Sequence, residues 1–188
     1  MELIRIKMVE DIKSILDYEK VIYNINLKSI MWGRLTKQGK YRIWKWLKYS
    51  RKYDFYSQYY DKGIFGKLAS IYYLRKKNTL ATKLGFDIDT PNIGKGLLIY
   101  HIGATVINGG AIIGENCILH GNNCIGNKGP AGSSCPVIGN NVEIGVGAKI
   151  IGGVTIADNI KIGAGAVVVH SFTEEGITIG GVPAKKIN

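Results

Sequence analysis

Two histidines in the second half of the chain, His101 and His120, are the side chains best suited to acid–base chemistry. The pKa of histidine lies near neutrality, so an imidazole can take the proton from a hydroxyl group as its oxygen attacks a carbonyl. Asp87 and Asp89 precede His101, and a carboxylate on the far ring nitrogen would fix the tautomer and stabilise the imidazolium. The alternative for each histidine is a polar surface residue.

The segment that holds both histidines has an aliphatic residue at every sixth position, with a slip of two residues before Ile107 and a longer insertion after Ile125. A period of six fits neither a helix nor a long alternating strand, and it predicts a solenoid of short strands and corners whose aliphatic side chains stack inward. The repeat residues are Ile93, Ile99, Ile107, Ile113, Leu119, Ile125, Ile138, Ile144, Ile150, Ile156, Ile162 and Val168. Four positions later a small or aliphatic residue recurs, as Cys117, Val142, Ala148, Val154, Ile160 and Ala166.

The insertion after Ile125 reads GNKGPAGSSCP, and its Gly, Pro and Ser content predicts a loop that leaves the coil. A rigid scaffold often carries its functional residues on such a loop. The alternative is a tolerated surface insertion.

The two halves of the chain differ in composition. Residues 1–85 hold 19 Lys/Arg and 7 Asp/Glu, whereas residues 86–188 hold 6 and 7. Of the 18 aromatic residues, 15 precede residue 86, while 21 of the 25 glycines lie at or after Gly85. We therefore predict an α+β protein with an α-helical domain over residues 1–84 and a β-helix domain over residues 85–188.

Helical spacing of apolar residues predicts helices within residues 2–20 and 64–84, and an amphipathic helix in the basic, aromatic stretch 40–60. A second interpretation of residues 40–60 is peripheral attachment to an anionic membrane surface. Nucleic-acid binding is not expected, because no recognised module accompanies the charge. Neither a transmembrane run nor the apolar core of a secretory signal is found in the sequence. The odd number of cysteines favours a reducing compartment.

The stretches GLLIYHIGATVIN and VEIGVGAKIIGGVTIADNIKIGAGAVV, with the ending GGVPAKKI, resemble the serine acetyltransferase group of hexapeptide-repeat acyltransferases. Its short members, the O-acetyltransferases of colanic acid and capsule type, look closer still. The resemblance implies a left-handed parallel β-helix, acetyl-CoA as co-substrate, and a homotrimer with acetyl-CoA sites between subunits. No metal is expected, because a zinc-binding β-helix would need three histidines and the coils offer two.

The resemblance also assigns roles to residues. His101 in IYHIG matches the catalytic histidine, and Asp87 matches its aspartate partner if one residue is deleted before Ile93, which leaves Asp89 open. The positions that match acetyl-CoA contacts are Gly126, Asn127, Val146, Lys161, Ala164 and Lys185.

Three departures concern the acceptor. Tyr100 stands where serine acetyltransferases carry an aspartate, and Ser134 and Cys135 stand where they carry an Arg-His pair. Those charged groups hold the ammonium and carboxylate of serine, so their loss disfavours free serine. We expect Tyr100, Ser134, Cys135 and His120 to contact a different acceptor. The tail that docks on cysteine synthase is also missing, so no such complex is expected.

These observations predict an acetyl-CoA-dependent O-acetyltransferase that acts on a sugar hydroxyl in surface polysaccharide biosynthesis. We expect it in the cytoplasm, with the inner face of the membrane as a further location. Serine O-acetylation in cysteine biosynthesis is the alternative, and a non-catalytic β-helical scaffold is the third interpretation.

Overall fold

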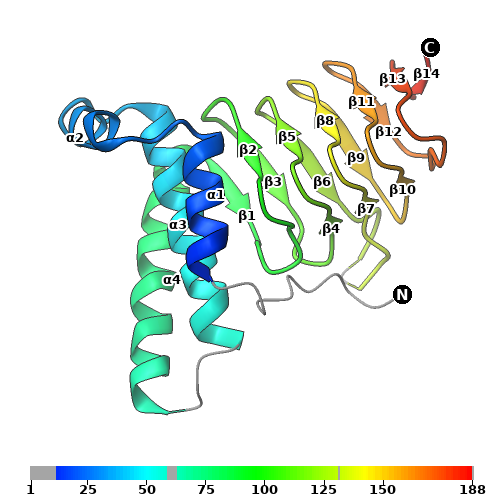
Figure 1. Ribbon diagram of the computed structural model, residues 1–188. Helices are drawn as coiled ribbons and strands as arrows, with labels where there is room; N and C mark the ends of the chain where they lie inside the picture. Colours follow the sequence, from blue (N-terminus) through cyan, green and yellow to red (C-terminus); the bar gives the residue numbers. More distant parts are fainter. Residues whose placement is uncertain (1–11, 59–62, 131, 188) are drawn as a thin grey trace.

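The computed structural model describes residues 12–58, 63–130 and 132–187, in which four helices precede a series of short strands (Figure 1). The helices are α1 (Ile12–Ile22), α2 (Leu27–Thr36), α3 (Gly39–Gln58) and α4 (Ile64–Leu84). The sequence did not predict α2, and the part of residues 2–20 before residue 12 lies outside the described residues. The helix α4 ends at Gly85, whose φ of 74° in the left-handed region suits glycine.

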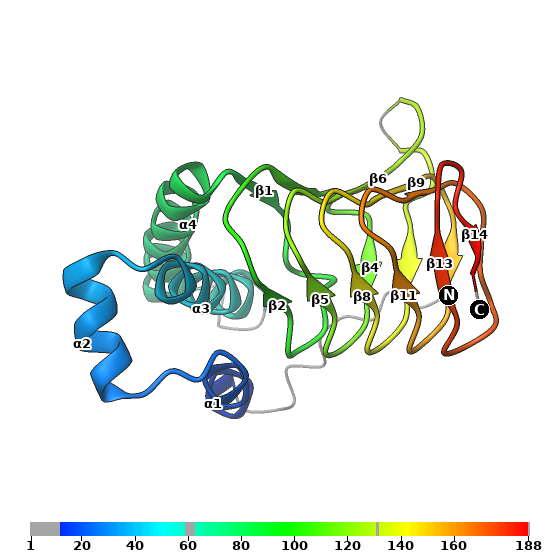
Figure 2. The same cartoon turned by 90° about the horizontal axis from the view of Figure 1, so that it is seen from above.

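The strands form three sheets that enclose the core of the coil (Figure 2). Sheet A has the order β1-β3-β6-β9-β12, sheet B has β10-β7-β4, and sheet C has β14-β13-β11-β8-β5-β2. All pairs are parallel except β13 with β14. The strands are β1 (Phe86–Ile88), β2 (Leu98–Ile99), β3 (Thr105–Ile107), β4 (Ile112–Ile113), β5 (Ile118–Leu119), β6 (Cys124–Gly126), β7 (Val137–Ile138), β8 (Glu143–Ile144), β9 (Lys149–Ile151), β10 (Thr155–Ile156), β11 (Lys161–Ile162), β12 (Val167–Val168), β13 (Thr178–Gly180) and β14 (Lys185–Lys186).

The six-residue repeat corresponds to one strand and one corner, and three repeats make one turn of the coil. On sheet A, for example, Ile107 pairs with Ile125 and Ile125 pairs with Ile150. Every aliphatic residue of the predicted series is at most 3% exposed. The inward stacking predicted from the period is therefore confirmed, and each coil buries the apolar face of its neighbour.

The helices cover the open end of the first coil. The indole of Trp46 in α3 packs edge-on against the ring of Phe86 in β1, with centroids 5.1 Å apart. Trp44 and Leu47 are also buried, and one apolar core runs from α3 into the coils. Because residues 40–60 place these large side chains in the core, those side chains are not available for the membrane contact considered for this stretch. The division into two domains at residue 84 stays a prediction.

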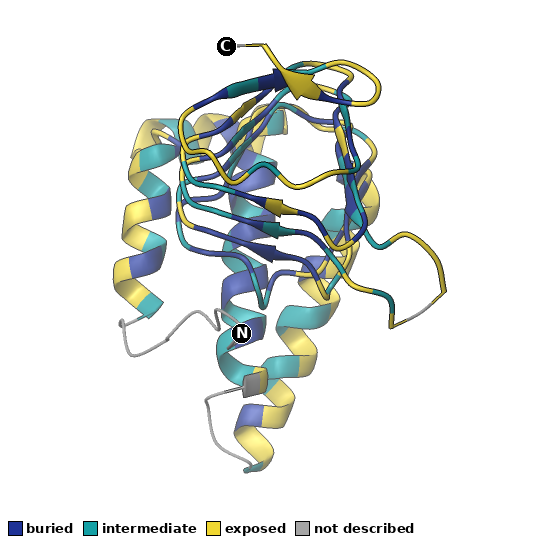
Figure 3. Cartoon of the chain, turned by 90° about the vertical axis from the view of Figure 1, so that its right-hand side faces the viewer, coloured by how far each residue is buried: buried dark blue, intermediate teal, exposed yellow. Residues whose placement is uncertain are grey.

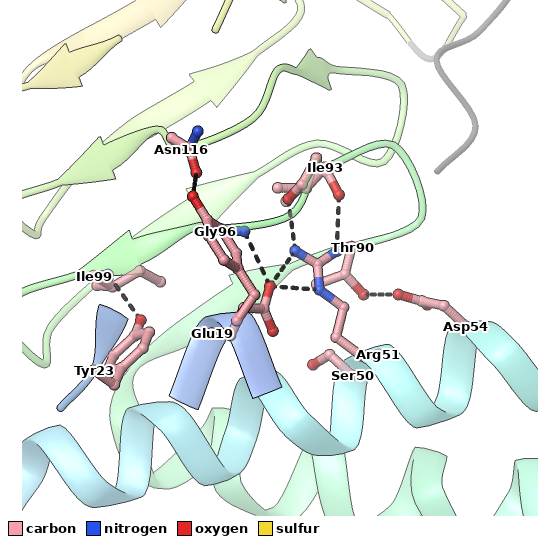
Figure 4. Close-up of polar contacts among 12 residues, drawn as sticks. Glu19, Tyr23, Ser50, Arg51, Asp54, Thr90, Ile93, Gly96, Ile99 and Asn116 are labelled. Carbon is pink, nitrogen blue, oxygen red and sulfur yellow. Dashed lines mark hydrogen bonds and ion pairs between the residues drawn. The ribbon is translucent and has the colours of Figure 1, made fainter. Parts of the chain in front are cut away.

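A buried polar cluster joins the helices to the first coil (Figure 4). Arg51 of α3 is fully buried and forms an ion pair with Glu19 of α1 at 2.8 Å. Its guanidinium also donates to the carbonyl oxygens of Ile93 and Gly94, at 2.8 and 2.6 Å. Arg51 thereby satisfies backbone carbonyls at the end of the coil, where the next coil is missing.

A second buried carboxylate, Asp54, lies one turn further along α3. Its Oδ2 accepts a hydrogen bond from Thr90 Oγ1 at 2.6 Å, and its Oδ1 has no partner among the described residues. Desolvation raises the pKa of Asp54, and the Thr90 hydrogen bond and the charges of Arg51 and Lys77 oppose this only in part. At pH values between the unfolded and the folded pKa of this carboxyl, the native state therefore binds more protons than the unfolded chain.

The raised pKa of Asp54 predicts a pH-dependent effect of Asp54→Asn. Between the unfolded pKa near 3.8 and the raised folded pKa, the wild-type free energy of unfolding falls with rising pH, because the native state binds more protons. Asparagine has the same shape and no charge, so the variant lacks this slope and gains stability relative to the wild type as the pH rises. Urea unfolding of both proteins across this pH range measures the difference, and two parallel curves would contradict the expectation.

Candidate active site

His101 follows β2 at the corner between sheets C and A, and its side chain is exposed. The next coil leaves little space beside it, because a Cβ added to Gly121 would lie 3.3 Å from the His101 Cβ. Gly121 has a φ of 113°, a conformation that other residues rarely adopt. His101 makes no hydrogen bond or ion pair with the described part of the chain, so both ring nitrogens are open to a substrate.

His120 and Tyr100 lie beside His101 on the same edge. The ring centroids of Tyr100 and His120 are 5.0 Å apart, and those of Tyr100 and His101 are 6.4 Å apart. His120 Nε2 lies 2.9 Å from Glu143 Oε1, which orients the imidazole. Glu143 was not among the candidates from the sequence. The sequence feature that could have identified Glu143 is a carboxylate at an outward position of the repeat, one coil beyond His120.

Asp87 and Asp89 differ in their surroundings. The buried ammonium of Lys77 on α4 lies 3.6 Å from Asp89 Oδ1, whereas Asp87 has no ion pair or hydrogen bond among the described residues. The contact between Lys77 and Asp89 is thus the second one that the sequence did not reveal. No ion pair joins His101 to Asp87 or Asp89 in the described ranges, so the assignment of Asp87 as partner of His101 stays a prediction.

A groove of about 550 Å³ runs along the outer side of sheet A. It brings Asp87 and Asp89 together with two of the predicted acetyl-CoA contacts, Gly126 and Asn127. Asn108, a further lining residue missed from the sequence, donates from Nδ2 to Asn127 Oδ1 at 3.1 Å. The complete lining is Asp87, Asp89, Val106, Ile107, Asn108, Gly109, Cys124, Ile125, Gly126, Asn127 and Ile151.

The predicted contacts Val146 and Ala164 lie in line with His101. The strand register pairs Ile99 with Leu119, Leu119 with Ile144 and Ile144 with Ile162, so residues 101, 121, 146 and 164 follow one another along the edge. The predicted phosphate contacts lie elsewhere: Lys161 begins β11 on sheet C and Lys185 begins β14, and both are exposed.

Ser134 and Cys135 lie on the loop between β6 and β7, which projects from the coils (Figure 3). That loop leaves the edge between sheets A and B, so sheet A separates it from the edge that carries His101. Cys135 Sγ lies 3.4 Å from Asn108 Oδ1. Within one chain, the predicted acceptor contacts therefore fall into two groups. Tyr100 and His120 lie beside His101, whereas Ser134 and Cys135 lie on the loop.

Comparison with known proteins places this geometry in context. The family model described as bacterial transferase hexapeptide (six repeats) matches residues 135–170. The chain is similar to the soybean serine acetyltransferase apoenzyme, with a TM-score of 0.71, 26% identity, and coverage of 94% of this chain and 69% of that one. It is also similar to the serine acetyltransferase of Neisseria gonorrhoeae in complex with serine, with a TM-score of 0.67, 28% identity, and coverage of 96% and 71%. No curated protein sequence matches.

These matches support a hexapeptide-repeat acyltransferase. They imply an N-terminal helical region followed by a left-handed parallel β-helix, as the sequence predicted. They do not distinguish the polysaccharide subgroup. Because the solved structures are serine acetyltransferases, serine O-acetylation is at least as well supported by them as a sugar acceptor.

Proposed function

We propose that this protein is an acetyl-CoA-dependent O-acetyltransferase in which His101 is the general base. The observation that carries the proposal is the exposed imidazole at the corner of the coil, unpaired within the described chain. Residues 135–170, which match the hexapeptide transferase model, lie further along the same series of coils.

In the proposed reaction, His101 takes the proton of the acceptor hydroxyl as its oxygen attacks the thioester carbonyl. When the tetrahedral intermediate collapses, the carbon–sulfur bond breaks and the imidazolium returns the proton to the thiolate of coenzyme A. Asp87 would stabilise the imidazolium. Gly126, Asn127, Val146 and Ala164 would line the pantetheine arm. Lys161 and Lys185 would pair with phosphates as charge-assisted donors.

A homotrimer is part of the proposal. Hexapeptide-repeat transferases typically form trimers, and within one chain the loop with Ser134 and Cys135 is separated from His101 by sheet A. A neighbouring copy that brings its loop to the His101 edge would unite the two groups of acceptor contacts. The site would then be incomplete in a monomer.

The acceptor that we propose is a sugar hydroxyl in surface polysaccharide biosynthesis. Tyr100, Ser134 and Cys135 stand where serine acetyltransferases carry charged groups, so the ammonium and carboxylate of free serine would lack those partners here. The hydroxyl groups of Tyr100 and Ser134 can instead hydrogen-bond to neutral hydroxyls. The second candidate, serine O-acetylation, is favoured by the likeness to solved serine acetyltransferases.

Acceptor competition tests the proposal. Purified protein with acetyl-CoA is offered serine or a panel of neutral saccharides, and release of the coenzyme A thiol is followed. We expect at least one saccharide to exceed serine in kcat/KM. A kcat/KM for serine that equals or exceeds that of every saccharide would overturn the sugar acceptor and favour the second candidate. Absence of acetyl-CoA binding by calorimetry would instead indicate a non-catalytic scaffold.

A further inference from the structure

The short helix α2 exposes an apolar stripe. Leu27, Met31 and Leu35 are spaced four residues apart and therefore lie on one face of the helix. They are 79%, 73% and 77% exposed, and Trp32 beside them is 58% exposed. The inner side of α2 is held by Gly33, which packs against Tyr41 of α3. The stripe is therefore presented outward by a helix anchored to the core.

The first half of α4 carries a second apolar stripe. Ile64, Phe65, Leu68, Ile71 and Tyr72 are all more than half exposed. Both helices lie at the end of the molecule opposite the last coils (Figures 1 and 2). Figure 1 shows the two stripes as separate patches, since α2 lies at the top of the helical part and the first half of α4 at its lower end. Several large apolar side chains exposed side by side in each patch mark an interaction surface, unlike single exposed residues.

The charged side chains beside these two apolar stripes are all positive. Neither α2 nor α4 contains an aspartate or glutamate. Lys28 and Arg34 flank the stripe of α2 at helical spacing, and Lys67, Arg75 and Lys76 lie on α4. All five are exposed. The surroundings are also positive, since residues 1–85 carry 19 Lys/Arg against 7 Asp/Glu.

We propose that α2 and the first half of α4 attach the protein peripherally to an anionic membrane surface. A helix that lies in the membrane–water interface buries its apolar face at the boundary of the lipid acyl chains and keeps its basic residues at the lipid headgroups. Basic residues near the surface add electrostatic attraction to anionic lipids. A second copy docked on the same face would bring two positive surfaces together, and like charges oppose that contact.

This assignment differs from the membrane contact considered for residues 40–60, since α3 places Trp44, Trp46 and Leu47 in the core. It is independent of the proposed acceptor. If the acceptor is carried on a lipid, attachment through the helices would hold the coils at the surface where that acceptor lies.

Vesicle co-sedimentation tests the attachment. We expect the wild-type chain to bind vesicles of phosphatidylcholine mixed with phosphatidylglycerol, not to bind phosphatidylcholine alone, and to be released by high salt. The variant Leu27→Ser/Met31→Ser/Leu35→Ser should lower the partition coefficient on anionic vesicles at least about tenfold, because three exposed apolar side chains no longer insert. Its thermal midpoint by circular dichroism should match that of the wild type, since these side chains are exposed in the folded chain.

The matched control is Val182→Ser/Ile187→Ser, which removes two exposed apolar residues from the opposite end of the molecule and should leave vesicle binding unchanged. Should the triple variant unfold, Lys28→Glu/Arg34→Glu provides the same test through charge. Failure of the wild-type protein to bind anionic vesicles would overturn the proposal. Binding that both α2 variants retain would do so as well. Sedimentation showing self-association that the triple variant abolishes, without vesicle binding, would assign the face to a second copy.

Discussion

Replacing His101 with alanine is expected to lower kcat for acetyl transfer by about 10²–10⁴-fold, the usual contribution of a general base. The imidazole stands exposed at the corner after β2 with neither ring nitrogen engaged by the described chain. Alanine keeps the backbone and the Cβ, and the imidazole that it removes is exposed, so the coil and its apolar core are preserved. The loss should therefore fall on kcat, while the affinity for acetyl-CoA measured by calorimetry stays close to that of the wild type.

The control for this variant is His170→Ala. His170 is also exposed, but it follows β12 and lies outside the groove and the His101 edge. Its removal should change kcat less than about twofold, as expected of a surface substitution away from the site. Full activity of the His101 variant would reject the mechanism. A loss of acetyl-CoA binding equal to the loss of kcat/KM would show that His101 binds the co-substrate and does not act as a base.

Replacing Arg51 with methionine is expected to lower the free energy of unfolding by about 3–5 kcal/mol, the cost of removing one partner from a buried ion pair. Arg51 is fully buried, and its loss leaves Glu19 without its cation. The carbonyl oxygens of Ile93 and Gly94 lose their donor as well. Urea denaturation followed by circular dichroism measures the change.

A double-mutant cycle separates the ion pair from the loss of side-chain volume. Glu19→Gln/Arg51→Met should cost less than the two single substitutions together, because the double variant leaves no unpaired charge in the core. The comparison variant Lys40→Met removes an exposed cation from the same helix and should change stability by less than about 0.5 kcal/mol. Strict additivity of Glu19→Gln and Arg51→Met would contradict the coupling that the 2.8 Å contact implies.

The β-helix could be predicted because its information is local. Residues such as Ile144, Ile150 and Ile156 repeat at a period that no helix and no long strand accommodates, and all of them are buried. The helix α4 was predicted for a similar reason. In contrast, α2 was not predicted, although Leu27, Met31 and Leu35 also have helical spacing.

The candidate site was predicted only in part. His101 was proposed from its residue type and the resemblance of the surrounding motif, and its role stays a prediction. The contacts of His120 with Glu143, of Lys77 with Asp89 and of Asn108 with Asn127 were not. Each of these pairs joins residues from different coils or from a helix and a strand. The repeat pattern shows which residues face inward, but it does not show which side chains from different coils or elements come within contact distance.

By itself, the sequence determined the coil, the inward position of its aliphatic residues and the candidate base, because a short period and a motif are properties of neighbouring residues. Only the tertiary structure decided that Arg51 pairs with Glu19 at the first coil, that α3 places Trp44, Trp46 and Leu47 in the core, and that sheet A separates His101 from the loop with Ser134 and Cys135. Burial and side-chain pairing depend on which distant segments pack together. That choice is made by the whole chain as it minimises exposed apolar surface and unpaired buried charge.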